Sequence, residues 1–141
     1  MTDFSIRPYH DADELSLVAL WAAVLPPNAP HNDPATSLRK KLAADRELLL
    51  VAEASGEVAG AVMGGYDGHR GWVYSLAVRP DRRRRGIGTA LVRRMETMLA
   101  ELGCLKVNLQ VRTSNAGVVE FYERLGFRVE EILSLGKRLY G

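Results

Sequence analysis

The sequence predicts an α/β protein of the α+β type, in which a sheet is flanked by helices. Three apolar runs follow one another between residues 47 and 78 and are separated by short turns, a pattern typical of antiparallel strands. A long amphipathic helix comes next, because apolar residues recur at helical spacing from Gly86 to Leu102. With 141 residues the chain is long enough for a sizeable core, and we expect a single domain over residues 1–141.

The first part of the chain predicts a strand and a helix. Residues 4–8 alternate apolar and polar side chains, as a half-buried strand does. Asp11 and Glu14 resemble a capping box, so we expect a helix from there to about Leu25, where Pro26-Pro27 stops it. Its apolar residues at helical spacing are Leu15, Val18, Ala22 and Leu25.

A second helix is predicted from Asp33 to about Asp45. Asp33 is suited to cap a helix, and Pro34 at the first helical position forgoes no hydrogen bond. We expect the face formed by Arg39, Lys40 and Lys41 to lie in solvent.

The remaining elements follow from turn residues and apolar runs. Ser55-Gly56 and Asp67-Gly68 are turn dipeptides, and Gly103 and Gly126 are suited to end helices. The predicted strands cover residues 47–54, 58–66, 72–78 and 105–111, a helix covers 115–125, and a last hairpin joins 127–132 to 133–139.

The segment between strand 72–78 and the long helix predicts a binding site for phosphate. Pro80 ends the strand, four arginines occupy residues 82–85, and Gly86 and Gly88 open the helix. Glycines leave backbone N–H groups accessible, and a helix start has unpaired N–H donors and a partial positive charge. These features together predict a cradle for a pyrophosphate group. The P-loop pattern is absent, and Leu91 stands where a dinucleotide fingerprint needs its third glycine.

Two motifs resemble the signatures of the GCN5-related N-acetyltransferase (GNAT) family. Arg83-x-x-Gly86-x-Gly88 is similar to the family's acetyl-CoA signature, and residues 115–127 are similar to its second signature, an asparagine followed by Y-x-x-x-G-F. The resemblance is good over residues 48–127, and segments 64–71 and 133–139 further resemble the bacterial YpeA-like branch. The resemblance implies the GNAT fold, a mixed and mostly antiparallel sheet with helices on both faces.

The resemblance also implies acetyl-CoA as co-substrate. The pyrophosphate is expected at the arginine and glycine loop, and the pantetheine arm along the backbone of the strand before it. The residues implied in binding are Leu76, Ala77, Val78, Arg83, Arg84, Arg85, Gly86, Ile87, Gly88, Thr89, Asn115 and Tyr122.

Two catalytic roles follow from the same resemblance. The backbone N–H of Val78 is implied as the donor to the oxyanion, and Tyr122 as the acid that protonates the departing thiolate. Two alternatives stay open from the residues alone: Tyr122 as a packed aromatic, and Asn115 as a helix N-cap.

The general base and the acceptor are not identified by the sequence. Strand 72–78 has no carboxylate where several relatives of the family have a glutamate, so Glu53, Asp67 and His69 are all candidates. No metal-ligand spacing occurs, and we expect no metal. The acceptor is expected to be an amine, of a small molecule or a protein, bound near residues 26–33, 66–71 and the final hairpin.

Composition limits the partners. The formal net charge is only +2 and the positive charge is local, which argues against a general nucleic-acid binder. The single cysteine, Cys104, is expected to be a buried thiol. No signal peptide pattern and no apolar run of membrane-spanning length occur, so we expect a cytoplasmic protein without a membrane partner. The oligomeric state stays open, a homodimer included.

Three functions therefore compete. The first is an acetyl-CoA-dependent N-acetyltransferase. The second is a non-catalytic acyl-CoA sensor on the same fold, which the missing carboxylate keeps open. The third is a nucleic-acid-binding module that uses residues 82–85, but the chain lacks the interleaved aromatics and the basic face that such a module needs.

Overall fold

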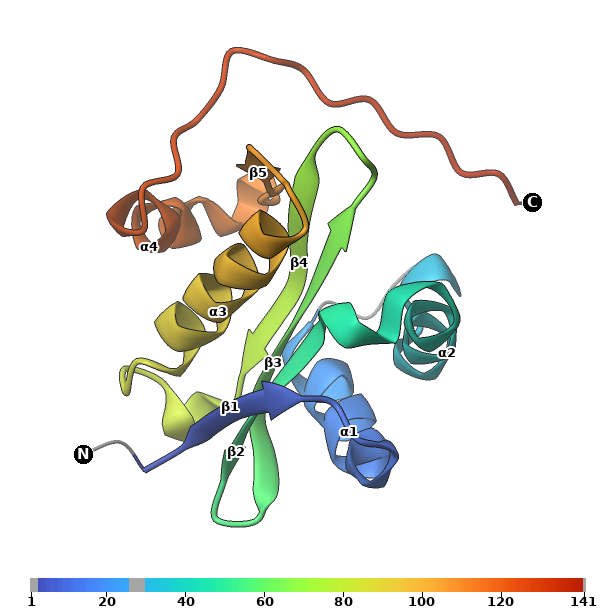
Figure 1. Ribbon diagram of the computed structural model, residues 1–141, viewed down its shortest axis with the longest axis vertical. Helices are drawn as coiled ribbons and strands as arrows, with labels where there is room; N and C mark the ends of the chain where they lie inside the picture. Colours follow the sequence, from blue (N-terminus) through green and yellow to red (C-terminus); the bar gives the residue numbers. More distant parts are fainter. Residues whose placement is uncertain (1–2, 26–29, 141) are drawn as a thin grey trace. The chain divides into compact units, whose positions relative to one another are not determined.

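The computed structural model describes residues 3–25 and 30–140, which form two compact units, Met1–Gln110 and Val111–Gly141. The first unit contains a five-stranded sheet in the order β1-β2-β3-β4-β5 (Figure 1). The strands are β1 (Ser5–Pro8), β2 (Leu49–Ala54), β3 (Glu57–Tyr66), β4 (Gly71–Val78) and β5 (Val107–Asn108). The first four strands pair antiparallel, and β4 pairs parallel with β5. The predicted mixed, mostly antiparallel sheet is thereby confirmed.

Among the described residues, three α-helices flank this sheet, and one further α-helix belongs to the second unit. Their bounds are α1 (Glu14–Val24), α2 (Pro34–Asp45), α3 (Ile87–Glu101) and α4 (Val119–Arg124). The predicted start of α2 is confirmed, because the Asp33 carboxylate accepts a hydrogen bond from the N–H of Thr36 at 3.0 Å. The predicted stop at Pro26-Pro27 lies outside the described residues.

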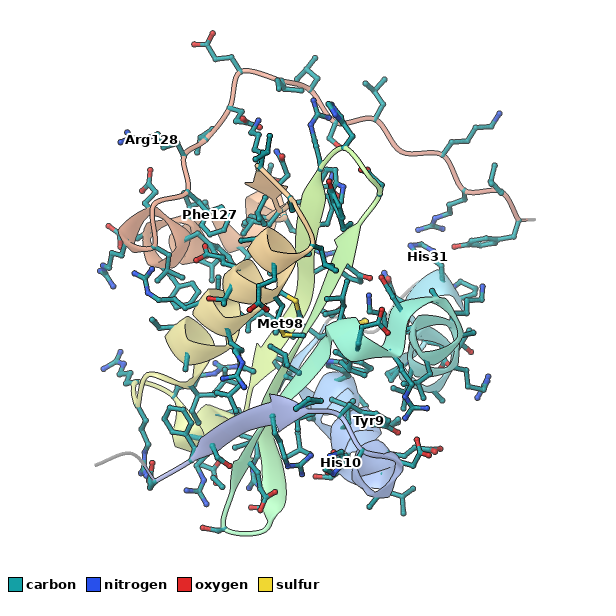
Figure 2. All side chains as sticks on the ribbon, viewed as in Figure 1. Tyr9, His10, His31, Met98, Phe127 and Arg128 are labelled. Atoms are coloured by element: carbon teal, nitrogen blue, oxygen red, sulfur yellow. The ribbon has the colours of Figure 1, made fainter. Side chains whose placement is uncertain are left out.

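Strands β2 and β3 are buried on both faces, which explains why their sequences are nearly continuous apolar runs. Helix α3 covers one face, and α1 and α2 cover the other (Figure 1). Figure 2 labels one residue in each layer, Met98 on the α3 side and Tyr9 on the α1 side. The core therefore consists of two hydrophobic layers separated by the sheet.

Helix α3 approaches the sheet closely at two glycines of β3. A Cβ atom on Gly60 would lie 2.8 Å from the Cγ2 of Ile87, and one on Gly64 would lie 2.8 Å from the Cγ of Met95. Both distances are shorter than a normal carbon contact. These two positions need glycine because of the close approach of the helix.

The buried face of α1 differs from the prediction. Leu17, Leu20 and Trp21 are buried, whereas Leu15 is 84% exposed and Ala22 is exposed. Nearly all residues of α1 are apolar, so their spacing was compatible with more than one inward face. The bulky indole of Trp21 packs into the core and decides which face is buried.

The start of α1 differs as well. A short 3-10 turn, η1 (Asp11–Asp13), precedes the helix, and the capping box joins His10 and Asp13 rather than Asp11 and Glu14. The Asp13 carboxylate accepts a hydrogen bond from the N–H of His10 at 2.8 Å and pairs with Arg7 at 2.8 Å. The Arg7 guanidinium holds the pKa of Asp13 below its usual value. Arg7, which lies on β1, thus ties Asp13 to the sheet.

Two further predictions for the first unit need correction. Lys41 was expected in solvent, but it is only 5% exposed because α2 turns it toward the sheet. The strand expected over residues 105–111 is reduced to β5, which pairs only with Gly71 and Trp72. A strand needs a hydrogen-bonded neighbour, and β5 has one over two residues only. The buried thiol predicted for Cys104 is confirmed.

The second unit differs most from the prediction. The helix expected over residues 115–125 is a 3-10 segment, η5 (Thr113–Val118), followed by α4. Asn115 has non-helical backbone angles inside η5, so it does not act as the N-cap of α4. Gly126, at φ +98°, ends the helix as predicted.

The last predicted hairpin is wrong for this structure. Residues 127–140 form no strand among the described residues and are drawn as coil in Figure 1. Their apolar side chains are exposed, Val129 by 77% and Leu133 by 89%. The sequence pattern was strand-like, but no described strand pairs with this segment, and a strand without a partner gains no ladder of hydrogen bonds.

Candidate active site

The edge of β4 that faces β5 is open over most of its length. Strand β5 pairs only with Gly71 and Trp72, so no described strand pairs with residues 73–78 on that side. Open strand edges carry unpaired N–H and C=O groups, and a ligand with amide groups can pair with them.

The hydrogen-bond pattern places Val78 at this open edge. The N–H of Arg79 donates to the carbonyl of Ala59 at 2.8 Å, so Arg79 and Ala59 are a hydrogen-bonded pair of the antiparallel ladder. Bonded and non-bonded pairs alternate, so the polar backbone groups of the next residue, Val78, point away from β3. Accordingly, the carbonyl of Val78 accepts a hydrogen bond from the Nε of Arg83 at 3.3 Å.

By the same alternation the backbone groups of Ala77 face β3. Ala77 is the register partner of Ala61, one step beyond the non-bonded pair of Val78 and Gly60. Of the three strand residues predicted to bind the pantetheine arm, Ala77 is therefore the one whose backbone faces the neighbouring strand. Leu76 and Val78 remain the candidates at the open edge.

A β-bulge lies in the middle of β4. Tyr74 pairs with Met63 and Ala77 with Ala61, so β4 has one residue more than β3 between these pairs. Ser75 has φ +54°, a left-handed conformation that is uncommon for residues other than glycine. The bulge interrupts the regular pairing of β4 with β3 within the open stretch of residues 73–78.

Two residues of the loop after β4 have a left-handed backbone conformation. Arg84 has φ +64° and Gly86 has φ +85°. Gly86 is the N-cap of α3, and the first intrahelical bond runs from the N–H of Ala90 to the carbonyl of Gly86. The N–H groups of Ile87, Gly88 and Thr89 precede that bond and are free of intrahelical partners. The predicted phosphate-binding residues are thus brought together at one helix start.

The arginines of the loop differ in their partners. Arg82 donates to the Oγ of Ser55 at 3.2 Å, and Arg85 pairs with Asp3 at 3.1 Å. Arg83 is held by the end of β4. Arg84 makes no hydrogen bond or ion pair with a described residue. The sequence did not distinguish these four side chains. In the structure, Arg84 is the one whose guanidinium group has no partner among the described residues.

Tyr122 lies in the second unit and packs against aromatic neighbours on both sides. Its ring centroid is 4.9 Å from that of Phe121 and 5.7 Å from that of Phe127, both in edge-to-face arrangements. The turn at Gly126 brings Phe127 back onto Tyr122, which explains the spacing of this motif. Burial raises the pKa of Tyr122, so its hydroxyl is protonated at neutral pH.

The candidate bases are engaged in other contacts. Glu53 pairs with Arg7 at 2.9 Å. Asp67 accepts hydrogen bonds from the N–H groups of Arg70 and His69 at 2.7 and 2.8 Å, and these bonds lower its pKa. Glu53 is committed to Arg7 and Asp67 to backbone N–H groups of its own turn, so the base stays unassigned.

Within residues 3–25 and 30–140, no group of three or more histidine, cysteine, aspartate or glutamate side chains could hold a metal ion. In the same part of the chain, no helix has the length and apolar character needed to cross a bilayer.

Comparison with protein families identifies the class. The model of the family described as "Acetyltransferase (GNAT) family" matches residues 15–127. The chain is therefore an acyltransferase, and it belongs to the GNAT family of acetyltransferases.

Relatives of this chain are also named acetyltransferases. "Acetyltransferase YE1169" of Yersinia enterocolitica is 45% identical over 136 residues, which cover 95% of this chain and 94% of the relative. "Acetyltransferase SG1711" of Sodalis glossinidius is 46% identical over 137 residues, with the same two coverages. The match thus extends over nearly the full length of both chains.

Solved structures confirm the predicted fold. Ard1 from Thermoplasma volcanium is 26% identical with a TM-score of 0.81, over 92% of this chain and 85% of that one. AAC(6')-Iy, solved with the bisubstrate analogue CoA-S-monomethyl-acetylneamine, is 20% identical with a TM-score of 0.78, over 96% of this chain and 98% of that one. At 20% identity, the second likeness concerns the fold alone.

Proposed function

We propose that this acetyltransferase uses acetyl-CoA as donor and transfers the acetyl group directly to a primary amine. The observation that carries the proposal is the continuity of the open edge of β4 with the start of α3. One end of this surface offers N–H groups for a pyrophosphate, and the rest offers a strand edge for the amides of the pantetheine arm. We keep the expectation that the protein works in the cytoplasm.

The proposed mechanism assigns one step to each part of the site. The neutral amine attacks the carbonyl carbon of the thioester, and the carbonyl oxygen of the thioester becomes an oxyanion. The N–H of Val78, at the open edge, donates to that oxyanion. The C–S bond then breaks, and the thiolate takes the hydroxyl proton of Tyr122, which is later restored from solvent. The amine loses its proton to a base that is not assigned, directly or through water.

Asn115 and Thr89 have supporting roles in this proposal. Thr89 lies in the first turn of α3 and can add its hydroxyl to the phosphate cradle. Asn115 does not cap α4, so its side chain is not committed to that role and is proposed to bind the CoA arm.

The direct test is acetyl-CoA binding by calorimetric titration. Gly88→Glu places a side chain and a negative charge at the pyrophosphate site, so it should abolish measurable binding. Glu101→Gln, at the other end of α3, serves as the control and should bind as the wild type does. An affinity for CoA that is unchanged in Gly88→Glu would exclude the proposed cradle. Turnover of a panel of amines then separates an enzyme from a non-catalytic acyl-CoA sensor.

A further inference from the structure

The last part of the chain, residues 127–139, has the sequence of an amphipathic strand but pairs with no strand among the described residues. Its odd-numbered positions are mainly apolar and its even-numbered positions mainly polar, as in a strand with one buried face. After Phe127, the apolar residues at odd positions are Val129, Leu133, Leu135 and Leu139, and they are 77% to 92% exposed. The exceptions to the alternation are Glu131, Ile132 and Lys137. Exposed apolar side chains that gather on one segment mark an interaction site.

The sheet has a free edge of matching character. Strand β5 is the last strand of the sheet, and in the described part of the chain it pairs with β4 alone, so its outer side has no strand beside it. Leu105, Val107 and Leu109 alternate with polar residues in this segment. Val107 and Leu109 pack against the hydrophobic layer that α3 covers, whereas Leu105 is 98% exposed. An added strand with one apolar face would extend this layer and complete the edge.

The apolar sides of the two segments limit how they can pair. A shift of one residue would turn the apolar side of one strand to the other face, so only registers that differ by two residues keep the apolar sides together. Antiparallel pairing is the slightly more stable arrangement. With Leu109 opposite Leu133, an antiparallel pair also brings the opposite charges of Arg112 and Glu130 across from each other.

The two neighbouring registers bring like charges together. A shift by two residues in one direction puts Lys106 opposite Arg138. The same shift in the other direction puts Arg112 opposite Arg128. Like charges directly opposite each other destabilise a strand pair, so the charges favour the register that pairs Leu109 with Leu133.

A second copy of the chain fits both surfaces at once. Each chain has one strand-like tail and one free sheet edge, and within the described residues neither is paired with a strand. If each copy adds its tail to the edge of the other, both tails and both edges gain their hydrogen bonds. The two contacts are then related by a two-fold axis, and no tail or edge is left over for a third copy.

The apolar area is sufficient for a stable dimer. Fully burying an aliphatic side chain removes about 60–120 Å² of apolar surface from water. The four apolar residues at odd positions of each tail, taken over two copies, thus remove roughly 500–1,000 Å². The facing edge residues and the strand backbones add to this area, so the total reaches the about 1,000 Å² that a specific interface needs.

We propose that the protein forms a homodimer by exchange of its C-terminal strands. Residues 128–139 of each copy pair antiparallel with residues 105–112 of the other copy, at the outer edge of β5. The exchange explains why the sequence predicts a strand in the tail although the single chain forms none there. The proposal goes beyond the proposed function and does not depend on it.

The first test measures the mass of the protein in solution. The chain has a mass of 15.6 kDa, so light scattering after size-exclusion chromatography should give twice that mass at micromolar concentration. Leu133→Glu places a charge in the apolar face of the tail, and the change occurs twice in a symmetric dimer. It should raise the Kd of the dimer about 10²-fold or more, which sedimentation over a dilution series measures.

Leu15→Glu is the matched control for Leu133→Glu. Leu15 lies on α1 and is exposed to a similar extent as Leu133, so the same chemical change is made outside the proposed interface. The Kd of the dimer should be the same in Leu15→Glu as in the wild type.

The second test asks which chain supplies the strand. Residues directly opposite each other in an antiparallel pair are within the distance that a disulfide spans. The variants Leu109→Cys and Leu133→Cys are unfolded together, refolded as a mixture and mildly oxidised. A disulfide-linked species with one chain of each variant should form. Leu15→Cys in place of Leu109→Cys should give no more linked species than the wild type, whose buried Cys104 is present in every variant.

Three results would overturn the exchange. The first is a wild-type protein that stays monomeric at micromolar concentration. The second is a dimer whose Kd does not change in Leu133→Glu, because its interface would then lie elsewhere. The third is a disulfide within one chain that carries both cysteines, without any link in the mixture, because the tail would then pair with the edge of its own chain.

The cysteine mixture decides alone if circular dichroism shows that Leu133→Glu does not fold. None of these measurements involves acetylation or CoA. Failure of the exchange therefore leaves the proposed function intact, whereas unchanged CoA binding in Gly88→Glu bears on the proposed function only.

Discussion

The proposed acid catalysis depends on the hydroxyl group of Tyr122. Burial disfavours the phenolate and raises the pKa of Tyr122 above its ordinary value near 10. The acid must be protonated, so activity should fall only as pH rises through that raised pKa. The alkaline limb of the kcat profile should therefore lie above about pH 10.

Tyr122→Phe should lower kcat roughly 10²-fold, within the usual range for general acid catalysis. The alkaline limb due to Tyr122 should disappear from the profile, while CoA affinity stays within a few-fold because the ring still packs against Phe121 and Phe127. Acetyl donors with better leaving groups need no proton and should show a smaller loss. An equal loss with every donor would indicate damaged geometry, and an unaltered rate would return Tyr122 to a packing role.

The arginines of the phosphate loop can be distinguished by their partners. Arg84 is unpaired among the described residues, whereas Arg85 pairs with Asp3 at 3.1 Å. Arg84→Ala should therefore raise KM for acetyl-CoA several-fold at nearly constant kcat, and Arg85→Ala should raise it less. Added salt should reduce the difference in KM between the two variants, because both charges are exposed. A loss in kcat alone, or equal rises in KM, would contradict this assignment.

At the scale of elements, the packing of α3 against β3 determines where the phosphate cradle lies. The helix rests on Gly60 and Gly64, and its buried residues Ile87 and Met95 occupy the space that side chains there would fill. The sequence showed an apolar helix and an apolar strand, but not that glycines set their separation. The start of α3, and with it the cradle, is positioned by this contact.

Gly64→Ala should destabilise the first unit by about 1–3 kcal/mol, because the new methyl group overlaps the buried Met95. Gly65→Ala is the neighbouring control. Its methyl group would meet nothing closer than 3.7 Å, so the variant should be as stable as the wild type or slightly more stable. Thermal or urea unfolding of both variants checks the comparison. Equal stabilities would mean that Met95 moves aside without cost.

At the scale of the whole molecule, the residues predicted to act in binding and catalysis are divided between the two units. The open edge of β4, the loop and the start of α3 belong to the first unit, and Asn115 and Tyr122 belong to the second. The order of the two signatures along the chain agrees with the family that the chain belongs to. The phosphate cradle and the proposed acid are therefore carried by separate compact parts of one chain.

The sequence by itself determined most elements of the first unit, because their signals are local. Turn dipeptides separated β2, β3 and β4, and Asp33-Pro34 marked the start of α2. Glycines with left-handed backbones marked the ends of α3 and α4. The glycine and arginine loop was visible for the same reason, since a phosphate cradle is built from consecutive residues.

Tertiary structure decided whatever depends on a distant partner. Residues 105–111 and 127–139 have strand-like patterns, but a strand forms only where a neighbour supplies hydrogen bonds. The open edge of β4 exists because β5 is short. Lys41 lies in a charged and polar stretch of sequence, and only the packing of α2 against β3 and β4 brings it to Asp45, Gly64 and Tyr74. Contacts between residues far apart in the chain leave no periodic signal, so they could not be predicted from the sequence alone.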